Sequence, residues 1–167
     1  MSFHVIVGAG PVGSATARLL AARRCPTLLL ELDLEAPALD RALGVSMPPL
    51  SGFSQQVFRR LHEPGAPWNV VRPSDNLSLL LEGRIRTPGI LHGGAVAAAL
   101  ASLASSFRVI VAHLPVIDEV VEQPVFDAVT EALILAVARE QESEASALLV
   151  QRFAKKPLAD VIVGPLE

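Results

Sequence analysis

A glycine-rich turn near the start of the chain constrains the fold more than any other feature of the sequence. The apolar residues 3–7 predict a strand, and residues 14–24, which are rich in Ala and Leu and end in Arg, predict a helix. The turn between them reads Gly8-Ala9-Gly10-Pro11-Val12-Gly13. A second apolar run, residues 27–32, predicts a buried parallel strand and completes a β-α-β unit.

The same alternation of strands and helices is predicted along the rest of the chain. Between residues 33 and 73, six prolines separate two short helices, 37–43 and 53–61, and we interpret this stretch as a surface excursion. Further strands are predicted at 77–81, 107–112, 132–138 and 160–163, and further helices at 94–106, 120–129 and 143–154. This order predicts a three-layer α/β/α fold with a doubly wound, mostly parallel sheet, P-loop NTPase-like or Rossmann-like. A length of 167 residues fits one domain over residues 1–167.

Charge and composition exclude several classes of function. The net charge is −3, and no group of Lys and Arg is interleaved with aromatic residues, so we expect no direct nucleic-acid partner. One cysteine, Cys25, and no signal peptide before the first strand indicate a cytoplasmic protein. In the apolar segment 90–114, Gly93-Gly94 and Arg108 favour a helix followed by a strand over a transmembrane segment. We predict no metal site.

One interpretation of the glycine turn is a dinucleotide site. Gly8, Gly10 and Gly13 match the pattern G-x-G-x-x-G, in which the helix N-terminus receives a pyrophosphate. Glu31, at the end of the second strand, occupies the position at which an acid binds a ribose hydroxyl. This pattern predicts a small Rossmann-type domain of an oxidoreductase that binds NAD(P) or FAD.

The other interpretation of the same turn is a P-loop. Gly8 and Gly13 have the spacing of G-x-x-x-x-G-K-[ST], with Ser14 in place of the lysine and Ala15 in place of the hydroxyl that binds Mg²⁺. Backbone N–H groups of residues 10–15 still offer phosphates a site without a lysine. This pattern predicts ATP or ADP as the ligand, and the turn by itself does not separate the two interpretations.

Residues 32–44 read LDLEAPALDRALG, and residues 76–84 read NLSLLLEGR. The first segment resembles the ParA/MinD-type (SIMIBI) P-loop ATPases, with Glu31 and Asp33 in the positions of that family's acidic pair and a short helix that ends in Leu-Gly. The second resembles the strand and glycine turn of the branch that contains polysaccharide-export tyrosine kinases and pilus-assembly ATPases. The resemblance covers nearly the whole chain in order and implies a P-loop fold with a nucleotide at the first turn.

The positions that carry the charged groups of that family differ in this chain. The signature lysine is replaced by Ala9, the phosphate-binding lysine by Ser14, and the aspartate at the end of the strand 107–112 by Ala112. Phosphoryl transfer depends on electrostatic positioning, so we expect a pseudo-ATPase without catalytic residues. The expected nucleotide site consists of Gly8, Gly10, Val12, Gly13, Ser14, Ala15, Thr16, Glu31 and Asp33.

The resemblance implies a non-hydrolysing regulatory or scaffolding partner of a membrane-associated assembly for polysaccharide export, pilus formation or cell-pole placement, acting as a homodimer. Besides the Rossmann domain, one alternative is a hotdog thioesterase, because His92-Gly93-Gly94 resembles the entry to the central helix of those enzymes. Structural alternatives also stay open. In the first, Gly10 and Gly13 serve only the close packing of the strand and the helix. In the second, Glu31 and Asp33 simply end a strand in solvent. In the third, His113, which follows the strand 107–112, is a packed or solvent-facing residue and does not face the site.

Overall fold

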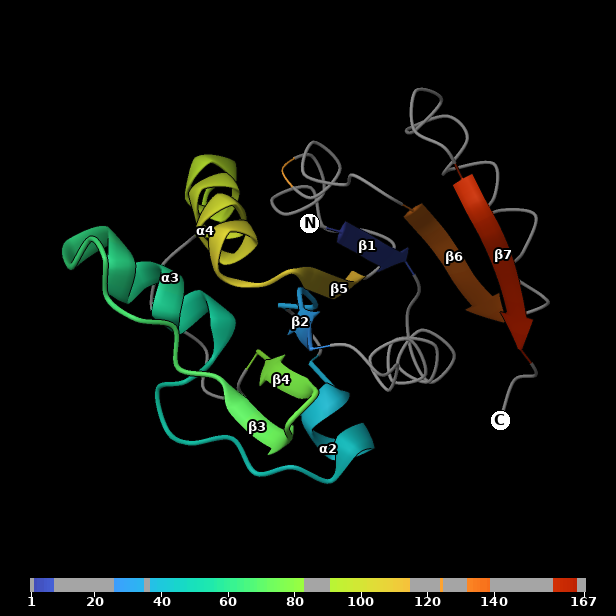
Figure 1. Cartoon of the computed structure of the whole chain (residues 1–167), viewed down its shortest axis with the longest axis horizontal. Helices are drawn as coiled ribbons and strands as arrows, with labels where there is room; N and C mark the ends of the chain where they lie inside the picture. The colour runs from blue at the N-terminus through green and yellow to red at the C-terminus, as the bar shows by residue number, and fades with distance from the viewer. Residues whose placement is uncertain are drawn as a thin grey trace.

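The computed structural model of the chain describes residues 2–7, 26–34, 37–82, 91–114, 124, 132–138 and 158–164. Within these residues seven strands form one sheet in the order β3-β4-β2-β5-β1-β6-β7 (Figure 1). The strands are β1 (Ser2–Val7), β2 (Thr27–Glu31), β3 (Val71–Ser74), β4 (Leu77–Leu80), β5 (Val109–Leu114), β6 (Ala132–Ala138) and β7 (Leu158–Gly164). All neighbouring strands are parallel except β3 and β4, which form an antiparallel hairpin. The prediction of a mostly parallel, doubly wound sheet is confirmed.

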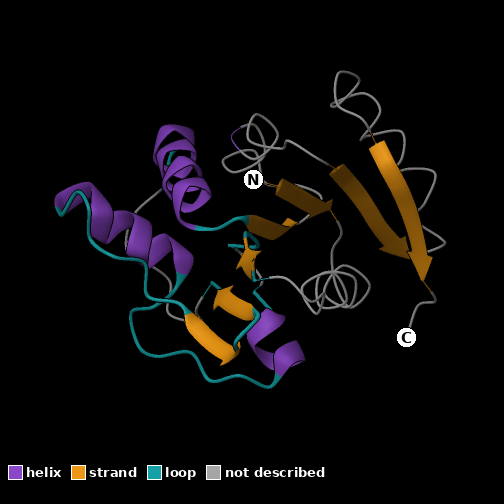
Figure 2. Ribbon diagram, viewed as in Figure 1, coloured by secondary structure: helices purple, strands orange, loops and turns teal. Residues whose placement is uncertain are grey.

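Helices cover both faces of the sheet. α3 (Phe53–His62) and α4 (Gly93–Ser106) lie over one face, and α2 (Leu39–Leu43) lies on the other (Figures 1 and 2). The predicted helices 37–43, 53–61 and 94–106 correspond to these three. The predicted helices 14–24, 120–129 and 143–154 lie outside the described residues, apart from Pro124. The layers are those of the predicted α/β/α fold.

Strand β2 lies inside the sheet, between β4 and β5, and an unbroken apolar run suits that place. Its five residues are all buried, because β4 and β5 flank it and helices cover both of its faces. Leu28 and Leu30 pack into the cluster beneath α3 and α4, whereas Leu29 packs into the cluster beneath α2. Successive side chains of a strand point to opposite faces, so a run of leucines supplies both clusters.

The interpretation of residues 33–73 as a surface excursion is wrong for helix α3. Phe53 and Val57 belong to the apolar cluster that α3 and α4 share with the sheet. Gln56 is also buried, and its side-chain amide donates to the carbonyl oxygens of Ser51 and Asn69 at 2.6 and 2.9 Å and accepts from the Asn69 backbone N–H at 2.7 Å. Prolines on both sides of this helix do not prevent an amphipathic segment between them from entering the core.

The same stretch also contains β3, a strand that the sequence did not predict. Pro73 argues against a strand because it donates no hydrogen bond to a neighbour. β3 tolerates it because the strand lies at the edge of the sheet and pairs with β4 alone. A proline at an edge also discourages pairing with another chain.

Strand β5 begins and ends two residues later than predicted. Phe107 still belongs to the end of α4, because its backbone N–H donates to the Leu103 carbonyl oxygen at 2.9 Å. Ala112 is therefore an interior residue of β5, not its last residue. His113 lies within the strand and is buried, which corrects the expectation that it follows the strand.

Candidate functional site

The carboxyl ends of β2, β4 and β5 meet at one edge of the sheet, the edge at which open α/β sheets bind ligands. Of the predicted nucleotide-site residues, Glu31 and Asp33 are described and lie at this edge. The others are outside the described residues: Gly8, Gly10, Val12, Gly13, Ser14, Ala15 and Thr16. The described part of the site therefore consists of the carboxyl ends of β2, β4 and β5.

Glu31 binds the start of helix α2. One carboxylate oxygen, Oε1, accepts hydrogen bonds from the backbone N–H groups of Ala38 and Leu39, both at 2.8 Å. The other, Oε2, accepts from the backbone N–H of Glu82 at 3.1 Å. The first N–H groups of a helix have no partner within the helix, and the N-cap residue Ala38 offers no side-chain acceptor, so Glu31 supplies it from the neighbouring strand.

Burial makes the ionised form of Glu31 costly. The side chain is fully buried, and its pKa is raised from 4.5 to about 7, with desolvation as the largest cause. The three backbone hydrogen bonds lower the pKa in opposition, and the nearby charge of Asp33 raises it further. Asp33 is itself 9% exposed, so the alternative that both acids end a strand in solvent is wrong.

Glu82 binds the start of helix α3 in a similar way. Its Oε2 accepts from the Ser54 backbone N–H at 2.8 Å, and its Oε1 accepts a short hydrogen bond from the Ser54 hydroxyl. Glu82 is 4% exposed, and desolvation raises its pKa while the two bonds from Ser54 lower it. Helix N-termini favour a nearby negative charge, so each glutamate stabilises the helix that it caps.

The two glutamates lie on opposite faces of the sheet although each follows three leucines. Leu28 pairs with Ser78 and Leu30 with Leu80, so the second Leu-Leu-Leu-Glu segment is displaced by one residue along the sheet. Leu29 therefore shares the α2 face with Leu79 and Leu81, and alternation places Glu31 on that face. Leu80 packs on the α3 face, and Glu82 follows it there.

Sequence analysis placed Glu82 between a strand and a glycine turn and gave it no role. The signal that identifies it is its tetrapeptide, since Leu79 to Glu82 repeats Leu28 to Glu31 residue for residue. An acid directly after a buried apolar run lies at a strand end, where helix N-termini also lie in parallel α/β sheets. The repeat thus indicates two equivalent acids, and the structure shows Glu31 at the start of α2 and Glu82 at the start of α3.

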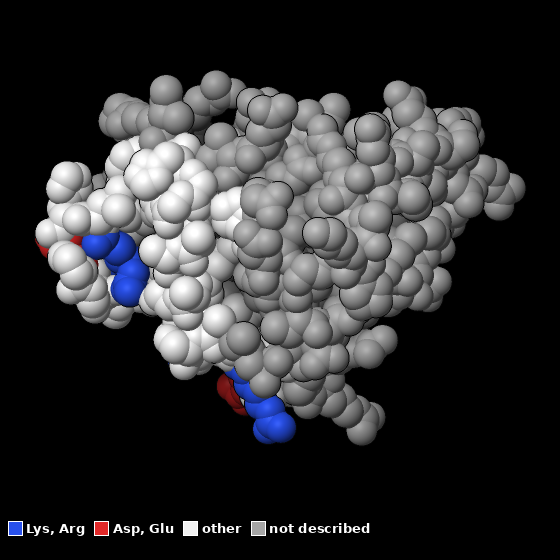
Figure 3. Space-filling model, turned by 90° about the horizontal axis from the view of Figure 1, so that it is seen from above, with Lys and Arg blue, Asp and Glu red and all other residues white. Residues whose placement is uncertain are grey.

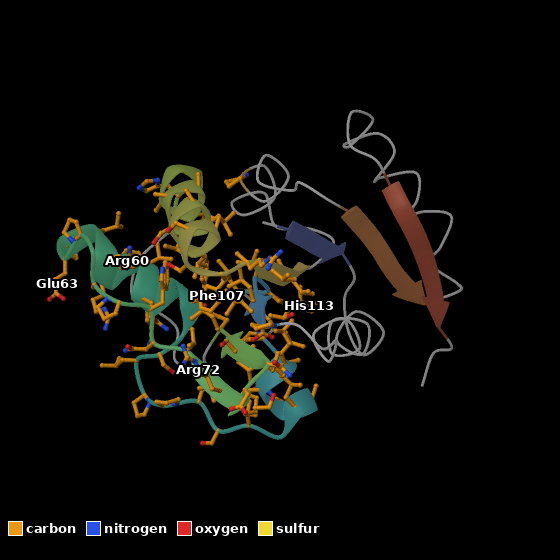
Figure 4. All side chains as sticks on the ribbon, viewed as in Figure 1. Arg60, Glu63, Arg72, Phe107 and His113 are labelled. Atoms are coloured by element: carbon orange, nitrogen blue, oxygen red, sulfur yellow. The ribbon has the colours of Figure 1, made fainter. Side chains whose placement is uncertain are left out.

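Strand β5 pairs with β2 and contributes Ala112 and His113 to the region of the strand ends. Ala112 is fully buried, lies opposite Leu30 on β2 and packs in the apolar cluster beneath α3 and α4. His113 is 2% exposed, its register partner on β2 is Glu31, and its carbonyl oxygen accepts from the Leu32 backbone N–H at 2.8 Å (Figure 4). The position aligned with the family's aspartate is therefore in apolar packing.

His92 has a structural role at the start of α4. Its Nδ1 accepts a hydrogen bond from the Ala95 backbone N–H at 3.2 Å, which caps the helix. Helix α4 packs on a parallel sheet, an arrangement that gives no support to the hotdog alternative.

In the described part of the chain, no three His, Cys, Asp or Glu side chains are grouped so as to hold a metal ion. None of the described helices is long and apolar enough to cross a membrane.

No family model matches the sequence, and no curated protein matches it. Among solved structures, the chain is similar to the VpsO kinase domain at 18% identity and a TM-score of 0.72, covering 99% of this chain and 85% of that chain. It is also similar to a chain of the MinC:MinD cell division protein complex of Aquifex aeolicus, at 18% identity and a TM-score of 0.70, covering 100% of this chain and 70% of that chain.

A third similar structure is a ParA family ATPase from Chlorobium tepidum TLS, at 16% identity and a TM-score of 0.67, covering 97% of this chain and 72% of that chain. All three identities are low, so these likenesses concern the fold. They show that the chain has the fold of the ParA/MinD-type P-loop proteins, the group that its sequence resembles.

Proposed function

We propose that the chain is a degenerate ParA/MinD-like P-loop protein that works as a non-hydrolysing regulatory or scaffolding partner of a membrane-associated assembly. The observation that carries the proposal is Ala112. It stands where the family has an aspartate, and it is fully buried beside Leu30 and Ile110 in an apolar cluster. A methyl group in that position offers neither a metal ligand nor a group that orients water.

The contacts of Glu31 support the same proposal. Both of its carboxylate oxygens accept backbone hydrogen bonds, and these bonds connect β2, α2 and the residue after β4. A carboxylate whose two oxygens both accept backbone hydrogen bonds has a structural role, because it holds these segments together at the strand ends. The substitutions of Ala9, Ser14 and Ala15 for the charged and hydroxyl groups of the P-loop point in the same direction.

The ligand that we propose is ATP or ADP, held by backbone N–H groups of the first turn without a lysine. The similarity to a protein named as a ParA family ATPase supports a nucleotide of this class. The charge distribution supports a protein partner and gives no reason to expect nucleic acid. On the described surface in Figure 3, charged side chains form two small separate groups, and each contains both signs.

Two measurements on the purified protein test the proposal. The first is phosphate release from ATP with Mg²⁺, for which we expect no turnover above the background without protein. The second is thermal unfolding with ATP, ADP, NAD⁺, NADPH and FAD, each with and without Mg²⁺. A ligand that binds the folded state raises the melting temperature with occupancy, so we expect a rise with ATP or ADP that does not depend on Mg²⁺.

A matched variant sharpens the test. Ser14→Lys combined with Ala15→Thr restores the lysine and the hydroxyl of the P-loop, and we expect its nucleotide-induced rise to become larger and dependent on Mg²⁺. Glu63→Ala, an exposed change on the loop after α3, serves as the control and should behave as wild type. Mg²⁺-dependent hydrolysis by the wild-type protein would refute the non-hydrolysing role, and a rise with a dinucleotide alone would favour the Rossmann alternative.

A further inference from the structure

The buried ionisable side chains of the described residues all lie at the carboxyl ends of the strands. They are Glu31, Asp33, Glu82 and His113, and each is 9% exposed or less. His113 is the register partner of Glu31, so both side chains point to the α2 face, and the charge of Asp33 also acts on Glu31. A carboxyl group that is buried beside another acid keeps its proton more readily than it does in water.

Helix α2 covers Glu31 and is only weakly anchored to the sheet. Leu39 is the one buried residue among its five, and Leu43 packs half-buried on the same cluster. Its N-cap residue, Ala38, offers no side-chain acceptor, so the N–H groups of Ala38 and Leu39 depend on Glu31. A helix of this length is not stable by itself, and segments with few buried contacts open locally while the rest of the protein stays folded.

Helix α3, which Glu82 caps, is anchored far more firmly. The side chain of Gln56 holds it to the carbonyl oxygens of Ser51 and Asn69. Four of its ten residues are buried, namely Phe53, Ser54, Gln56 and Val57. Water reaches Glu82 only if this part of the core is disrupted, whereas it reaches Glu31 when the first turn of α2 opens. Glu31 is therefore the buried acid that a local motion exposes.

Two effects oppose each other at Glu31. The three backbone N–H donors favour its ionised form, and burial, which favours the neutral form, is the larger effect and holds the pKa at about 7. Opening the start of α2 lets water reach the carboxyl group, which returns its pKa toward the ordinary 4.5. The closed form therefore binds a proton more tightly than the open form, and between these pH values a rise in pH favours opening.

We propose that the start of α2 is a proton-linked lid over Glu31, which closes on the neutral carboxyl group and opens when that group loses its proton. In the neutral form, with the proton on Oε2, Oε1 still accepts the N–H groups of Ala38 and Leu39. The open lid uncovers the buried acids of the α2 face at the edge where open α/β sheets bind ligands. The inference does not depend on a nucleotide and stands if the proposed function fails.

Amide hydrogen exchange of the full chain between pH 5 and pH 7.5 tests the lid. The exchange rate, corrected for the intrinsic rate at each pH, gives the opening constant of each amide. The opening constant at Leu39 should rise at least tenfold over this range, and about 50-fold is the limit for a carboxyl group that becomes fully hydrated. Leu29, fully buried inside β2, is the internal reference for opening of the whole sheet. At every pH the opening constant at Leu39 should exceed that at Leu29.

Variants assign the proton to one residue. In Glu31→Gln the opening constant at Leu39 should vary by less than about threefold, although Asp33 and His113 remain. Asp40→Asn removes the acid that α2 itself carries, half-buried in its first turn, and should keep the dependence of wild type. Leu39→Ala removes packing and keeps Glu31, so it should raise the opening constant at every pH with the same pH dependence. This variant and the wild type test the lid even if Glu31→Gln does not fold.

Three results would overturn the proposal. The first is a rise of less than tenfold at Leu39 in the wild-type protein. The second is an opening constant at Leu39 that equals that at Leu29, because α2 then opens only with the whole sheet. The third is a tenfold rise that persists in Glu31→Gln, which would assign the proton to Asp33 or His113.

Discussion

Residues 28–31 and 79–82 have the same sequence, Leu-Leu-Leu-Glu, and in each segment the glutamate caps a helix, on opposite faces of the sheet. Glu31 caps α2 on one face, and Glu82 caps α3 on the other. The difference comes from a displacement of one residue between the neighbouring strands, since Leu28 pairs with Ser78 and not with Leu79. In a sheet a shift of one residue moves every side chain to the other face, so register decides which helix a glutamate reaches.

The two caps also differ in how many groups depend on them. Glu31 satisfies three backbone N–H groups, and one of these belongs to Glu82, so the α2 cap also positions the start of the α3 cap. Glu82 satisfies one backbone N–H and one hydroxyl, both from Ser54. We therefore expect changes at Glu31 to reach further through the molecule than changes at Glu82.

Exchanging the last two residues of the second segment should have the largest effect. Leu81→Glu with Glu82→Leu keeps the composition but places the carboxylate on the α2 face, where Leu81 is fully buried. A buried carboxylate without partners, together with the lost contact to Ser54, should lower the free energy of unfolding by about 4 kcal/mol. Urea unfolding followed by circular dichroism measures the loss.

The control for this exchange is Leu61→His with His62→Leu, which exchanges two exposed residues at the end of α3. It should change the free energy of unfolding by less than about 0.5 kcal/mol. If the Leu81/Glu82 exchange is as stable as this control, register does not decide the roles of the two segments.

The pH dependence of stability should identify Glu31 as the costlier of the two buried acids to ionise. Its pKa of about 7 in the folded protein exceeds the ordinary 4.5, so the folded state binds more protons between these pH values. The free energy of unfolding should therefore fall as pH rises from 4.5 to 7, with Glu31 contributing about 3 kcal/mol of the fall. Urea unfolding at several pH values gives the slope.

Glu31→Gln removes this titration and should flatten the profile. The raised pKa of Glu82 leaves a smaller slope of the same sign in that variant. An unchanged slope in Glu31→Gln would show that other groups cause the pH dependence.

Truncating each glutamate should separate the two caps. Glu31→Ala leaves three backbone N–H groups without their acceptor and should cost about 2 kcal/mol, and Glu82→Ala should cost about 1.5 kcal/mol. Hydrogen exchange should locate the damage, with faster exchange at Leu39 in the first variant and at Ser54 in the second. Faster exchange at Leu39 in Glu82→Ala would contradict the assignment of the α2 cap to Glu31.

The smallest effect should come from Ser54→Ala. The variant loses the hydroxyl bond to Glu82 and keeps the backbone bond, so we expect a loss of about 1 kcal/mol. Because the lost bond also lowers the pKa of Glu82, that pKa should rise further in the variant. An NMR titration of the Glu82 carboxyl carbon checks the direction, and a lower pKa would show that Ser54 is not its stabilising partner.

Local patterns in the sequence are sufficient for much of the fold. The strands 27–32 and 132–138 and the Ala-rich helix near 94–106 agree with the structure to within one residue. Each is a long run of one kind, apolar and β-branched or leucine-rich in the strands, Ala-rich in the helix, so propensity and burial favour the same state. The resemblance also implied the Leu-Gly end of α2, and in the structure Gly44 adopts the left-handed conformation that ends a helix.

The strand β3 and the start of β5 were beyond the reach of local patterns. Pro73 lowers the propensity of β3, and only its position at the edge of the sheet makes the strand acceptable. Phe107 is apolar enough to begin β5, but its N–H completes the last turn of α4. In both places a contact with another element outweighs the preference of the residue itself.

The sequence by itself determined an α/β chain that resembles the ParA/MinD-type proteins, with an acid at the end of its second strand. What only the tertiary structure decided is what the acids at the strand ends do. Glu31 and Glu82 follow identical leucines, so no local pattern distinguishes them. A shift of one residue between the two strands decides which face of the sheet each glutamate lies on and which helix it binds. Burial beneath those helices raises the pKa of each glutamate. Both are properties of the assembled sheet.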